Sequence, residues 1–498
     1  MTVPFDFSTF DASRLYLNGT WQTGQGEPRP VDNPTTGAVL TQAAEATPEQ
    51  ALAALAAARQ AQPAWAAHST LERAAIMKRI AQLIREHHEE LATLVVLEQG
   101  KPLVEARGEI GGAAEFFDYY AEFARRIEGE ILPSDHAGEQ IWIQRVPVGV
   151  VVGIIPWNYP AALVSRKVAP AMIAGNTIVL KPHELTPLSA LYMAQLFEQA
   201  GVPAGVVNIV PGAGSTVGAA LCQAEGVDLI TMTGSVATGK KILGMAADNI
   251  TPVSLELGGK APFIVMADAD LDLAVKSAIT SRFMNCGQVC ICNERTLVER
   301  SIYQPFVERY TEMAAALRLG DPLEENIDLG PKVSRAELEK VHHYVKQAQS
   351  QGAKVTLGGD LPSNPPTAGG YWYAPTVVTD VSPDMDIMQN EIFGPVTPIM
   401  PFDTFDEAVS ISNASRYGLS AYLFTNDLTR VMRTISDVRF GEIYVNRIGP
   451  ESLQGFHVGY GSSGIGGDDG SHGLELYLRK KTVYVNTSGT SPTTLMPY

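Results

Sequence analysis

The fold is decided by Val150-Val-Val-Gly-Ile-Ile155, an unbroken apolar run that is followed by Pro156 and by a helical pattern near residues 160–173. A short apolar run without polar alternation indicates a strand that is buried on both faces. The same unit of strand and helix recurs three times. Strands are expected at Thr177–Leu180, Val206–Val210 and Leu229–Met232, and helices near 187–200, 215–224 and 236–247. This alternation predicts an α/β fold in which parallel strands are joined by crossover helices.

Helices and one exposed strand are expected ahead of this region. An alanine-rich helix should cover residues 51–65. A second helix should begin at Ser69, which forms a possible capping box with Glu72, and should continue until Gly100 stops it. The alternating pattern of Gln140–Val146 predicts a strand that could project as a hairpin.

The chain is long enough for several structural units. Its 498 residues leave room for about three domains at roughly 150 residues each. A second α/β stretch begins at Pro262-Phe-Ile-Val-Met266. Hydrophobic residues make up 45% of the chain and charged residues 18%, a composition that excludes disorder driven by charge.

Charge and targeting signals narrow the partners and the location. Lys and Arg number 37 and Asp and Glu number 54, so the net charge of −17 disfavours nucleic acid and anionic membranes as partners. Residues Met1–Leu17 lack the apolar core of a secretory signal, and the apolar runs elsewhere are too short to span a bilayer. We therefore expect a cytoplasmic protein that binds neither membranes nor nucleic acid.

Three of the four cysteines lie within seven residues, in Cys286-Gly-Gln-Val-Cys290-Ile-Cys292, which is not the spacing of a disulfide framework. Zinc would need a paired Cys-x-x-Cys or a matching set of histidines, and the nine histidines show no such spacing, so no metal is expected. Two interpretations remain open. The thiols either fill space in the core, or one of them is a nucleophile that requires a base and an oxyanion donor elsewhere.

Candidates for the base and the oxyanion donor follow predicted strands. Glu256, in Leu255-Glu-Leu-Gly-Gly-Lys260, is either a base with a pKa raised by burial or an edge-strand carboxylate that faces solvent. The two glycines there allow a ligand or backbone to approach closely. Asn158 follows the strand at 150–155, and its amide either donates to developing negative charge or serves only as a turn residue.

Two glycine loops, at Gly212–Gly218 and Gly234–Gly239, lie between a predicted strand and a predicted helix. Such loops suit a pyrophosphate at a helix N-terminus, but a tight turn has the same pattern, and neither loop is G-x-G-x-x-G. Lys181-Pro-His-Glu184 follows another strand, and the carboxylate of Glu184 could accept hydrogen bonds from ribose hydroxyls.

Together these segments resemble the aldehyde dehydrogenase superfamily over residues 15–485. The resemblance rests on six motifs in order: Pro156-Trp-Asn158, Lys181-Pro-x-Glu184, Thr233-Gly-Ser235, Leu255-Glu-Leu-Gly-Gly-Lys260, Asn285-x-Gly-Gln-x-Cys290 and Glu391-Ile-Phe-Gly-Pro395. It implies a Rossmann-type NAD-binding domain, an α/β catalytic domain and a small β oligomerisation arm, assembled as dimers or tetramers. The implied ranges are 1–129 with 148–258, 259–476, and 130–147 with 477–498, respectively.

The resemblance also implies a chemistry. Cys290 would be the nucleophile, Asn158 with the Cys290 backbone N–H the oxyanion hole, and Glu256 the base that activates water. The aldehyde would form a thiohemiacetal, give a hydride to NAD, and leave as a carboxylic acid after thioester hydrolysis. The implied cofactor contacts are Ile155, Pro156, Trp157, Lys181, Glu184, Gly214, Gly218, Gly234, Ser235, Leu257, Glu391 and Phe393. Glu184 would repel a 2′-phosphate, so we expect NAD rather than NADP.

Two positions of the substrate pocket differ from most of the superfamily. Arg166 stands where most members have a bulky apolar residue, and His457 where they have phenylalanine. These residues and the run Phe283–Cys290 resemble the lactaldehyde and glycolaldehyde dehydrogenase subgroup, with Asn158 as a third substrate contact. We therefore expect a small 2-hydroxyaldehyde as substrate, since a buried arginine without an anion is costly. The alternative is that Arg166 pairs with a nearby acid and that His457 merely packs.

Other functions fit the same residues. A cationic pocket would also suit another polar aldehyde, such as succinate semialdehyde or an amino-aldehyde. A non-catalytic NAD-binding or structural relative is the alternative from a different class, and the presence of Cys290, Glu256 and Asn158 together argues against it.

Overall fold

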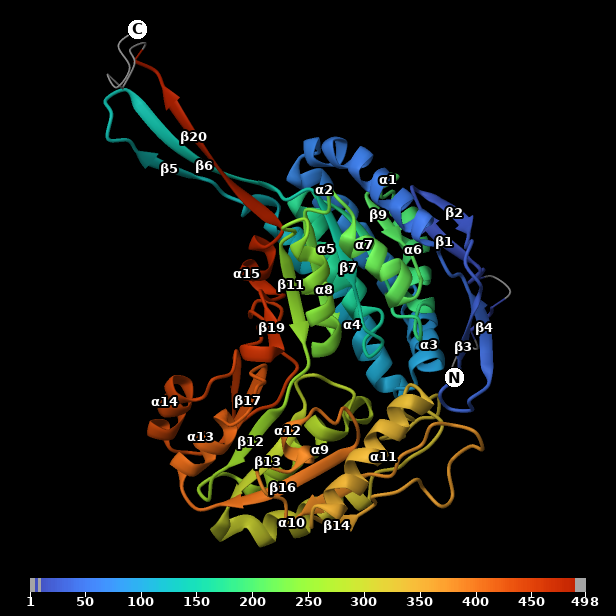
Figure 1. Cartoon of the computed structure of the whole chain (residues 1–498), viewed down its shortest axis with the longest axis vertical. Coiled ribbons are helices and arrows are strands. Elements are labelled where there is room, and N and C mark those ends of the chain that lie inside the picture. Colours follow the sequence, from blue (N-terminus) through green and yellow to red (C-terminus); the bar gives the residue numbers. More distant parts are fainter. Residues whose placement is uncertain (1–4, 8–9, 489–498) are drawn as a thin grey trace.

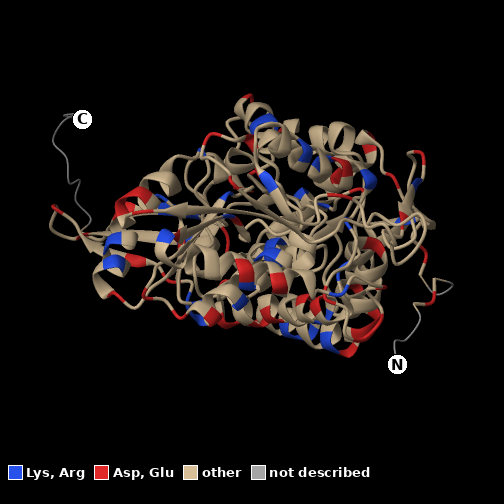
Figure 2. Cartoon of the chain, turned by 90° about the horizontal axis from the view of Figure 1, so that it is seen from below, with Lys and Arg blue, Asp and Glu red and all other residues tan. Residues whose placement is uncertain are grey.

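The computed structural model of the protein describes residues 5–7 and 10–488. Two sheets, each covered by helices on both faces, form the body of the molecule, and a third sheet projects away from it (Figure 1). In the view of Figure 2, acidic and basic residues are interspersed along the helices that cover the body. Within the described residues, no helix is both long enough and apolar enough to cross a membrane.

The first sheet has eight strands, and its centre has the parallel arrangement predicted from the sequence. Its spatial order is β19 (Gly464–Ile465), β11 (Val253–Leu257), β10 (Leu229–Gly234), β7 (Val150–Ile154), β8 (Thr177–Lys181), β9 (Val207–Ile209), β1 (Arg14–Leu17) and β2 (Thr20–Thr23). Strands β11, β10, β7, β8 and β9 are parallel, and β1 and β19 pair antiparallel at the two sides. Every residue of β7 is buried, because helices cover both faces of this sheet.

Helices of the first half of the chain cover both faces of the first sheet. On one face lie α2 (Thr70–Glu86), α3 (His88–Gln99), α4 (Leu103–Ala121), α5 (Ala162–Ala174) and α6 (Leu188–Gln199). On the other face lie α1 (Pro48–Ala67), α7 (Ala219–Gln223) and α8 (Val236–Ala247). A separate two-stranded sheet is formed by β3 (Arg29–Asp32) and β4 (Val39–Ala43).

Two predictions about helices are wrong in detail. The capping box of Ser69 and Glu72 is confirmed, but the helix that it starts ends before His87 (φ −102°, ψ 24°), and Gly100 instead ends α3 in a left-handed conformation. The apolar pattern continues across this break because α2 and α3 pack into the same core. The helix expected near 215–224 is a π-helical turn at Gly214–Gly218 followed by α7.

The second sheet has seven strands in the order β14 (Lys354–Leu357), β15 (Thr376–Thr379), β16 (Val396–Phe402), β13 (Asn293–Glu299), β12 (Ala261–Val265), β17 (Ser420–Phe424) and β18 (Glu442–Val445). One face packs against α9 (Leu271–Phe283) and α10 (Arg300–Ala315). The other packs against α11 (Arg335–Ser350), α12 (Asp386–Gln389) and α13 (Phe405–Asn413). Two helices complete the fold: α14 (Leu428–Asp437) and α15 (Gly470–Glu475).

The third sheet consists of β5 (Glu130–Pro133), β6 (Glu139–Pro147) and β20 (Leu478–Asn486), and it extends away from the body in Figure 1. The hairpin strand predicted at Gln140–Val146 is confirmed as part of β6. Apolar side chains on this extension face solvent, among them Ile131 at 72% and Tyr484 at 67% exposure.

Candidate active site

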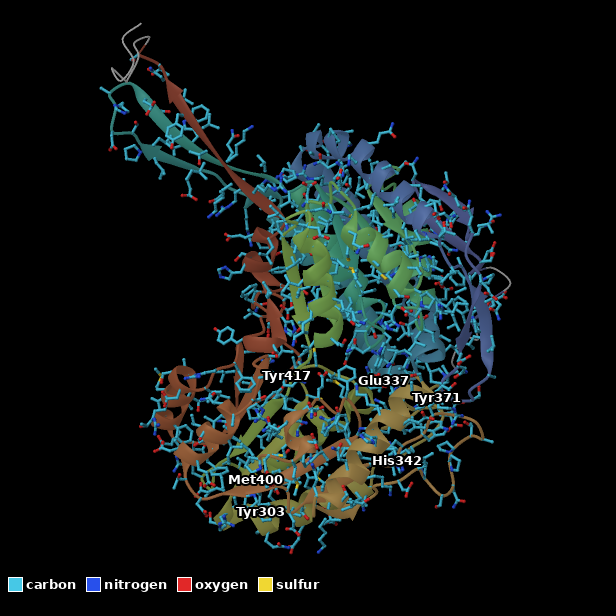
Figure 3. The ribbon with its side chains drawn as sticks, viewed as in Figure 1. Tyr303, Glu337, His342, Tyr371, Met400 and Tyr417 are labelled. Atoms are coloured by element: carbon cyan, nitrogen blue, oxygen red, sulfur yellow. The ribbon has the colours of Figure 1, made fainter. Side chains whose placement is uncertain are left out.

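A cavity of about 990 Å³ lies where the two halves of the body meet. Its wall combines residues that follow β7, residues of β11 and residues of α11. Figure 3 shows Glu337, one of these α11 residues, at the end of its helix nearest the first sheet. The predicted site residues that line the cavity are Pro156, Trp157, Asn158, Arg166, Gly234, Ser235, Glu256, Leu257, Cys290, Glu391, Phe393 and His457. Those outside this wall are Ile155, Lys181, Glu184, Gly214 and Gly218.

The loop that carries Cys290 is held in an uncommon backbone conformation. Asn285 and Cys286 have φ angles of 49° and 55°, in the left-handed region that few residues other than glycine adopt. The Asn285 side chain stabilises this turn, because its Nδ2 donates to the carbonyl of Asn158 (2.9 Å) and its Oδ1 accepts from Gln99 (2.9 Å). The loop is therefore fastened to the half of the molecule that contains the first sheet.

The four thiols occupy different environments. Cys222, Cys286 and Cys292 are at most 1% exposed, and burial raises their pKa values to about 12, 11 and 12. A thiol in such surroundings stays protonated and is inert. Cys290 is partly exposed and lines the cavity. The geometry therefore favours the nucleophile interpretation for Cys290 and the space-filling interpretation for the other three.

Asn158 lies where β7 gives way to α5, with its side chain at the cavity and only 6% of the residue exposed. Its Nδ2 donates one hydrogen bond, to the carbonyl of Gln288 at 3.1 Å. A carboxamide nitrogen has two protons to donate. Within residues 5–7 and 10–488, no acceptor takes the second proton, which leaves it for an oxygen atom of a ligand.

Glu256 is buried rather than exposed, so the alternative of a solvent-facing edge-strand carboxylate is wrong. The reason is that β19 pairs with β11 on its outer side, and Glu256 is only 2% exposed. In the described part of the chain, neither carboxylate oxygen has a hydrogen-bond partner. Burial raises the pKa of Glu256 well above its usual range, and the cation of His457, with Nε2 3.6 Å from Oε2, opposes this effect.

Arg166, on α5, has anionic partners. Its Nε donates to Asp469 at 2.9 Å, and its Nη2 contacts both Asp469 and Glu451. The argument that Arg166 needs a polar substrate because it lacks an anionic partner is therefore wrong, and the alternative that Arg166 pairs with a nearby acid is correct. Burial opposes the charge of Arg166, but Asp469 and Glu451 outweigh it and hold the pKa above its usual range. Nη1 makes no hydrogen bond to any described residue, and the side chain borders the cavity.

His457 does more than pack. Its Nδ1 lies 3.2 Å from Glu442 and 3.8 Å from Glu451, and these acids raise its pKa well above the usual range although burial and Arg166 lower it. One ligand atom from each of Glu442, Glu451 and His457 falls within 4.8 Å of the others, a spacing that could hold a metal ion. The Arg166 guanidinium already pairs with Glu451, so this carboxylate has a cationic partner without a metal ion.

The glycine loops and the Lys181–Glu184 segment have features that fit a dinucleotide. A Cβ added at Gly214 would meet nothing within 4 Å, so the turn is open on that side. Thr233 lines the cavity with a buried Oγ1 that has no hydrogen-bond partner among the described residues. Burial raises the pKa of Glu184. The ammonium of Lys181, 3.2 Å away, outweighs this effect together with His183, so the pKa falls to about 2. An ionised carboxylate of this kind suits ribose hydroxyls.

The cavity wall also contains Trp157 and Phe393, whose rings meet edge to face at 5.4 Å. Next to them, Glu391 accepts a hydrogen bond from the backbone of Gly259 at 2.9 Å, and burial raises its pKa to about 7. A Cβ at Gly259 would lie 2.5 Å from the backbone oxygen of Cys290, and a Cβ at Gly258 would lie 2.3 Å from the Glu391 carboxylate, so both glycines permit a close approach. The predicted close approach at the two glycines is thereby confirmed.

Several cavity residues were not predicted. Glu451 and Asp469 line the cavity, and together with Glu442, which lies outside its wall, they complete the charge cluster around Arg166 and His457. No motif identifies these three acids. Arg166 within the mostly apolar helix α5 was an available signal, because a buried guanidinium requires an acidic partner.

Comparison with known proteins agrees with this arrangement. The family model described as "Aldehyde dehydrogenase family" matches residues 21–483. The chain belongs to the aldehyde dehydrogenase family, and it is an NAD(P)-dependent aldehyde dehydrogenase.

Its relatives include a 3,6-anhydro-alpha-L-galactose dehydrogenase of Streptomyces coelicolor, 48% identical over 92% of this chain and 92% of that one. The lactaldehyde dehydrogenase of Escherichia coli is 46% identical over 95% of this chain and 98% of that one. A solved structure of 3,6-anhydro-L-galactose dehydrogenase in complex with NAP is 45% identical, with a TM-score of 0.93 over 95% of this chain and 99% of that one. The predicted superfamily and fold are thereby confirmed.

Proposed function

We propose that this enzyme uses NAD to oxidise a small 2-hydroxyaldehyde, such as lactaldehyde or glycolaldehyde, to the carboxylic acid. The observation that carries the proposal is the polar cluster of Arg166, Glu451 and His457 in the wall of the cavity that also contains Cys290. An aliphatic aldehyde gains nothing from such a wall, whereas a hydroxyl can donate to Glu451 and accept from Arg166. The similarity to lactaldehyde dehydrogenase supports the same substrate class.

In this proposal Cys290 attacks the aldehyde carbon, and the new oxyanion accepts hydrogen bonds from Asn158 Nδ2 and the Cys290 backbone N–H. A dinucleotide held by the contacts proposed below would supply the acceptor for the hydride of the thiohemiacetal. Glu256 then takes a proton from a water molecule, which attacks the thioester and releases the acid and the thiol. The free second proton of Asn158 and the buried position of Glu256 support these roles.

The charge of the cluster favours a neutral hydroxyl over a second carboxylate. Two cations, Arg166 and His457, face three carboxylates, those of Glu442, Glu451 and Asp469. The sum is about −1, so the distal carboxylate of succinate semialdehyde would add a like charge to a buried site. An amino-aldehyde would not meet this repulsion and is the second polar substrate to be compared.

NAD is the proposed cofactor because the ionised Glu184 would repel a 2′-phosphate. The proposed contacts are the twelve residues named above, from Ile155 to Phe393. The open turn at Gly214 and the unpartnered oxygen of Thr233 support a dinucleotide at this side of the cavity. The relative in complex with NAP makes NADP the second cofactor to be compared.

We further propose that residues 130–147 and 477–498 form an oligomerisation arm, and that the limits at 129, 147, 258 and 476 divide the NAD-binding, arm and catalytic regions. The exposed apolar side chains of β5 and β20 support an arm that packs against another copy. The last part of the arm, 489–498, lies outside the described residues. A cytoplasmic location is supported by four cysteines that form no disulfide.

The test follows the absorbance of reduced nicotinamide with purified enzyme. NAD and NADP are offered separately with glycolaldehyde, L-lactaldehyde, succinate semialdehyde, an amino-aldehyde and a long-chain aldehyde. We expect the highest kcat/KM with the two hydroxyaldehydes and NAD. A preference for the semialdehyde or the long-chain aldehyde would overturn the substrate assignment, and a preference for NADP would overturn the cofactor assignment.

A further inference from the structure

A buried lysine stands behind the cavity wall. Lys101 follows the left-handed Gly100 at the end of α3, and its side chain is fully buried. Its Nζ donates to the carbonyl of Asn158 at 2.8 Å and lies 2.5 Å from Glu109. The same ammonium lies 3.6 Å from the centre of the Tyr159 ring. Two of these three contacts are to one short segment, the turn between β7 and α5, and the third is to Glu109 on α4.

This turn is the one that presents Asn158. The carbonyl of Asn158 accepts from two donors, Lys101 Nζ and the Nδ2 of Asn285, the latter at 2.9 Å. The Asn158 side chain is fixed separately by its bond to Gln288. Lys101 and Asn285 thus hold the peptide that follows Asn158 from two sides, and rotation of that peptide would carry the amide away from its present direction.

Glu109 connects Lys101 to the start of α5. Its Oε2 pairs with Lys101, and its Oε1 accepts from the backbone N–H groups of Ala161 (2.9 Å) and Ala162 (3.2 Å) at the start of the helix. Burial lowers the pKa of Lys101, and Glu109 opposes that effect. A buried ion pair contributes little net stability compared with apolar residues of similar volume, because both charges lose their hydration. The ion pair of Lys101 and Glu109 instead fixes positions, since it connects the end of α3, α4 and the turn before α5.

We propose that Lys101 is a positioning residue that holds Asn158, through its carbonyl, in the direction required for the oxyanion. The proposal rests on the proposed role of Asn158 and is independent of the substrate's hydroxyl. Loss of a single oxyanion donor reduces kcat by about 10²–10³-fold, and a misplacement of about 1 Å can cost about 10²-fold. Lys101→Met should therefore lower kcat by about 10–100-fold and leave the KM for the cofactor within about twofold.

The test uses propanal as substrate, so that an error in the hydroxyaldehyde assignment cannot affect it. The kcat values of Lys101→Met, Asn158→Ala and the double variant are compared in a mutant cycle. If Lys101 acts through Asn158, the double variant loses no more activity than Asn158→Ala alone. Multiplicative losses would overturn the proposal, and so would a Lys101→Met kcat within twofold of the parent.

Lys101→Met leaves the buried Glu109 without its cationic partner, so a second variant is needed to detect a loss of activity that comes from misfolding. Lys101→Met/Glu109→Gln carries no unpaired charge and should show the same loss of kcat with an unchanged melting temperature, while Lys101→Arg should recover part of kcat. Glu98→Gln is the matched control, because Glu98 is also buried and accepts from two backbone N–H groups, those of Leu188 and Ser189 at the start of α6. Its kcat should equal that of the parent. An equal loss of kcat in Glu98→Gln would show that the effect is structural and would overturn the proposal.

Discussion

The catalytic assignment at the residue scale depends on the contrast between Cys290 and its neighbours. Cys286 and Cys292 are buried and have raised pKa values, whereas Cys290 borders the same cavity as Asn158 and Glu256. The sequence predicted these three cavity residues because each stands in a motif. It could not predict that Glu256 is covered, since the covering strand β19 comes from residues 464–465, far along the chain.

Replacement of the nucleophile tests this assignment. Cys290→Ala should reduce aldehyde oxidation to the background level, because no other exposed thiol borders the cavity among the described residues. Binding of NAD, measured by quenching of protein fluorescence, should be unchanged. Cys286→Ala is the control and should retain activity. Substantial turnover by Cys290→Ala would show that another group is the nucleophile.

The pH dependence of hydrolysis should respond to His457. The cation of His457 lowers the pKa of Glu256, which burial raises, so its removal should raise that pKa further. Because the base acts when ionised, the acid limb of the kcat profile should move to higher pH in His457→Phe. His342→Phe, a substitution beside Asp360 and outside the cavity wall, is the control and should leave the profile in place. An acid limb that stays fixed in His457→Phe would contradict the role of Glu256 as the base.

Elements that bury apolar runs on both faces, such as β7 and β8, are found where the sequence predicts them. Periodicity identified the helices but not the break at His87, since α2 and α3 bury the same kind of face in one core. The turn after α9 was also not predictable. Its left-handed residues are not glycines, and only the tertiary hydrogen bonds of Asn285 explain them.

The tight packing of that turn leads to a prediction about stability. Gly287 has a φ of 70°, and a Cβ there would lie 2.3 Å from the backbone oxygen of Gly394. Gly287→Ala should therefore destabilise the protein by about 1–3 kcal/mol or more, seen as a lower midpoint of thermal unfolding. Gly244→Ala is the matched control within α8, where nothing lies within 4 Å of the added Cβ. It should stabilise the protein by up to about 1 kcal/mol. Equal midpoints for Gly287→Ala and the parent would contradict this account of the turn.

At the scale of the whole molecule, the sequence could not show which residues far apart along the chain contact one another in the site. Arg166 on α5 pairs with Glu451 and Asp469, which lie 285 and 303 residues further along the chain. No local pattern encodes such a contact, because it depends on how α5 and the loops after β18 pack together. The projecting sheet, in contrast, was predicted from the alternation of Gln140–Val146 and the family resemblance.

The exposed apolar residues of that sheet test the proposed assembly. Ile131→Asp should weaken association of the chains, because Ile131 is 72% exposed on β5 and would be covered only by another copy. Light scattering coupled to gel filtration should then report a smaller assembly than the parent. Val104→Asp, at an equally exposed apolar residue on α4, should leave the assembly unchanged. A monomeric parent, or an Ile131→Asp variant of unchanged size, would contradict the oligomerisation arm.

The central claim is that Arg166 and its acidic partners recognise a substrate hydroxyl, and the ratio of kcat/KM for glycolaldehyde to that for propanal tests it most directly. Arg166→Leu should lower this ratio by about 10–100-fold, because a hydrogen bond to a charged group contributes about 1.5–3 kcal/mol. Any general damage from the unpaired Asp469 affects both substrates and cancels in the ratio. The control is Lys167→Leu. Lys167 lies on the same helix as Arg166 but outside the cavity wall, and its replacement breaks a buried ion pair with Asp468. The ratio for Lys167→Leu should equal that of the parent. An unchanged ratio in Arg166→Leu would show that this arginine does not recognise the hydroxyl and would contradict the account.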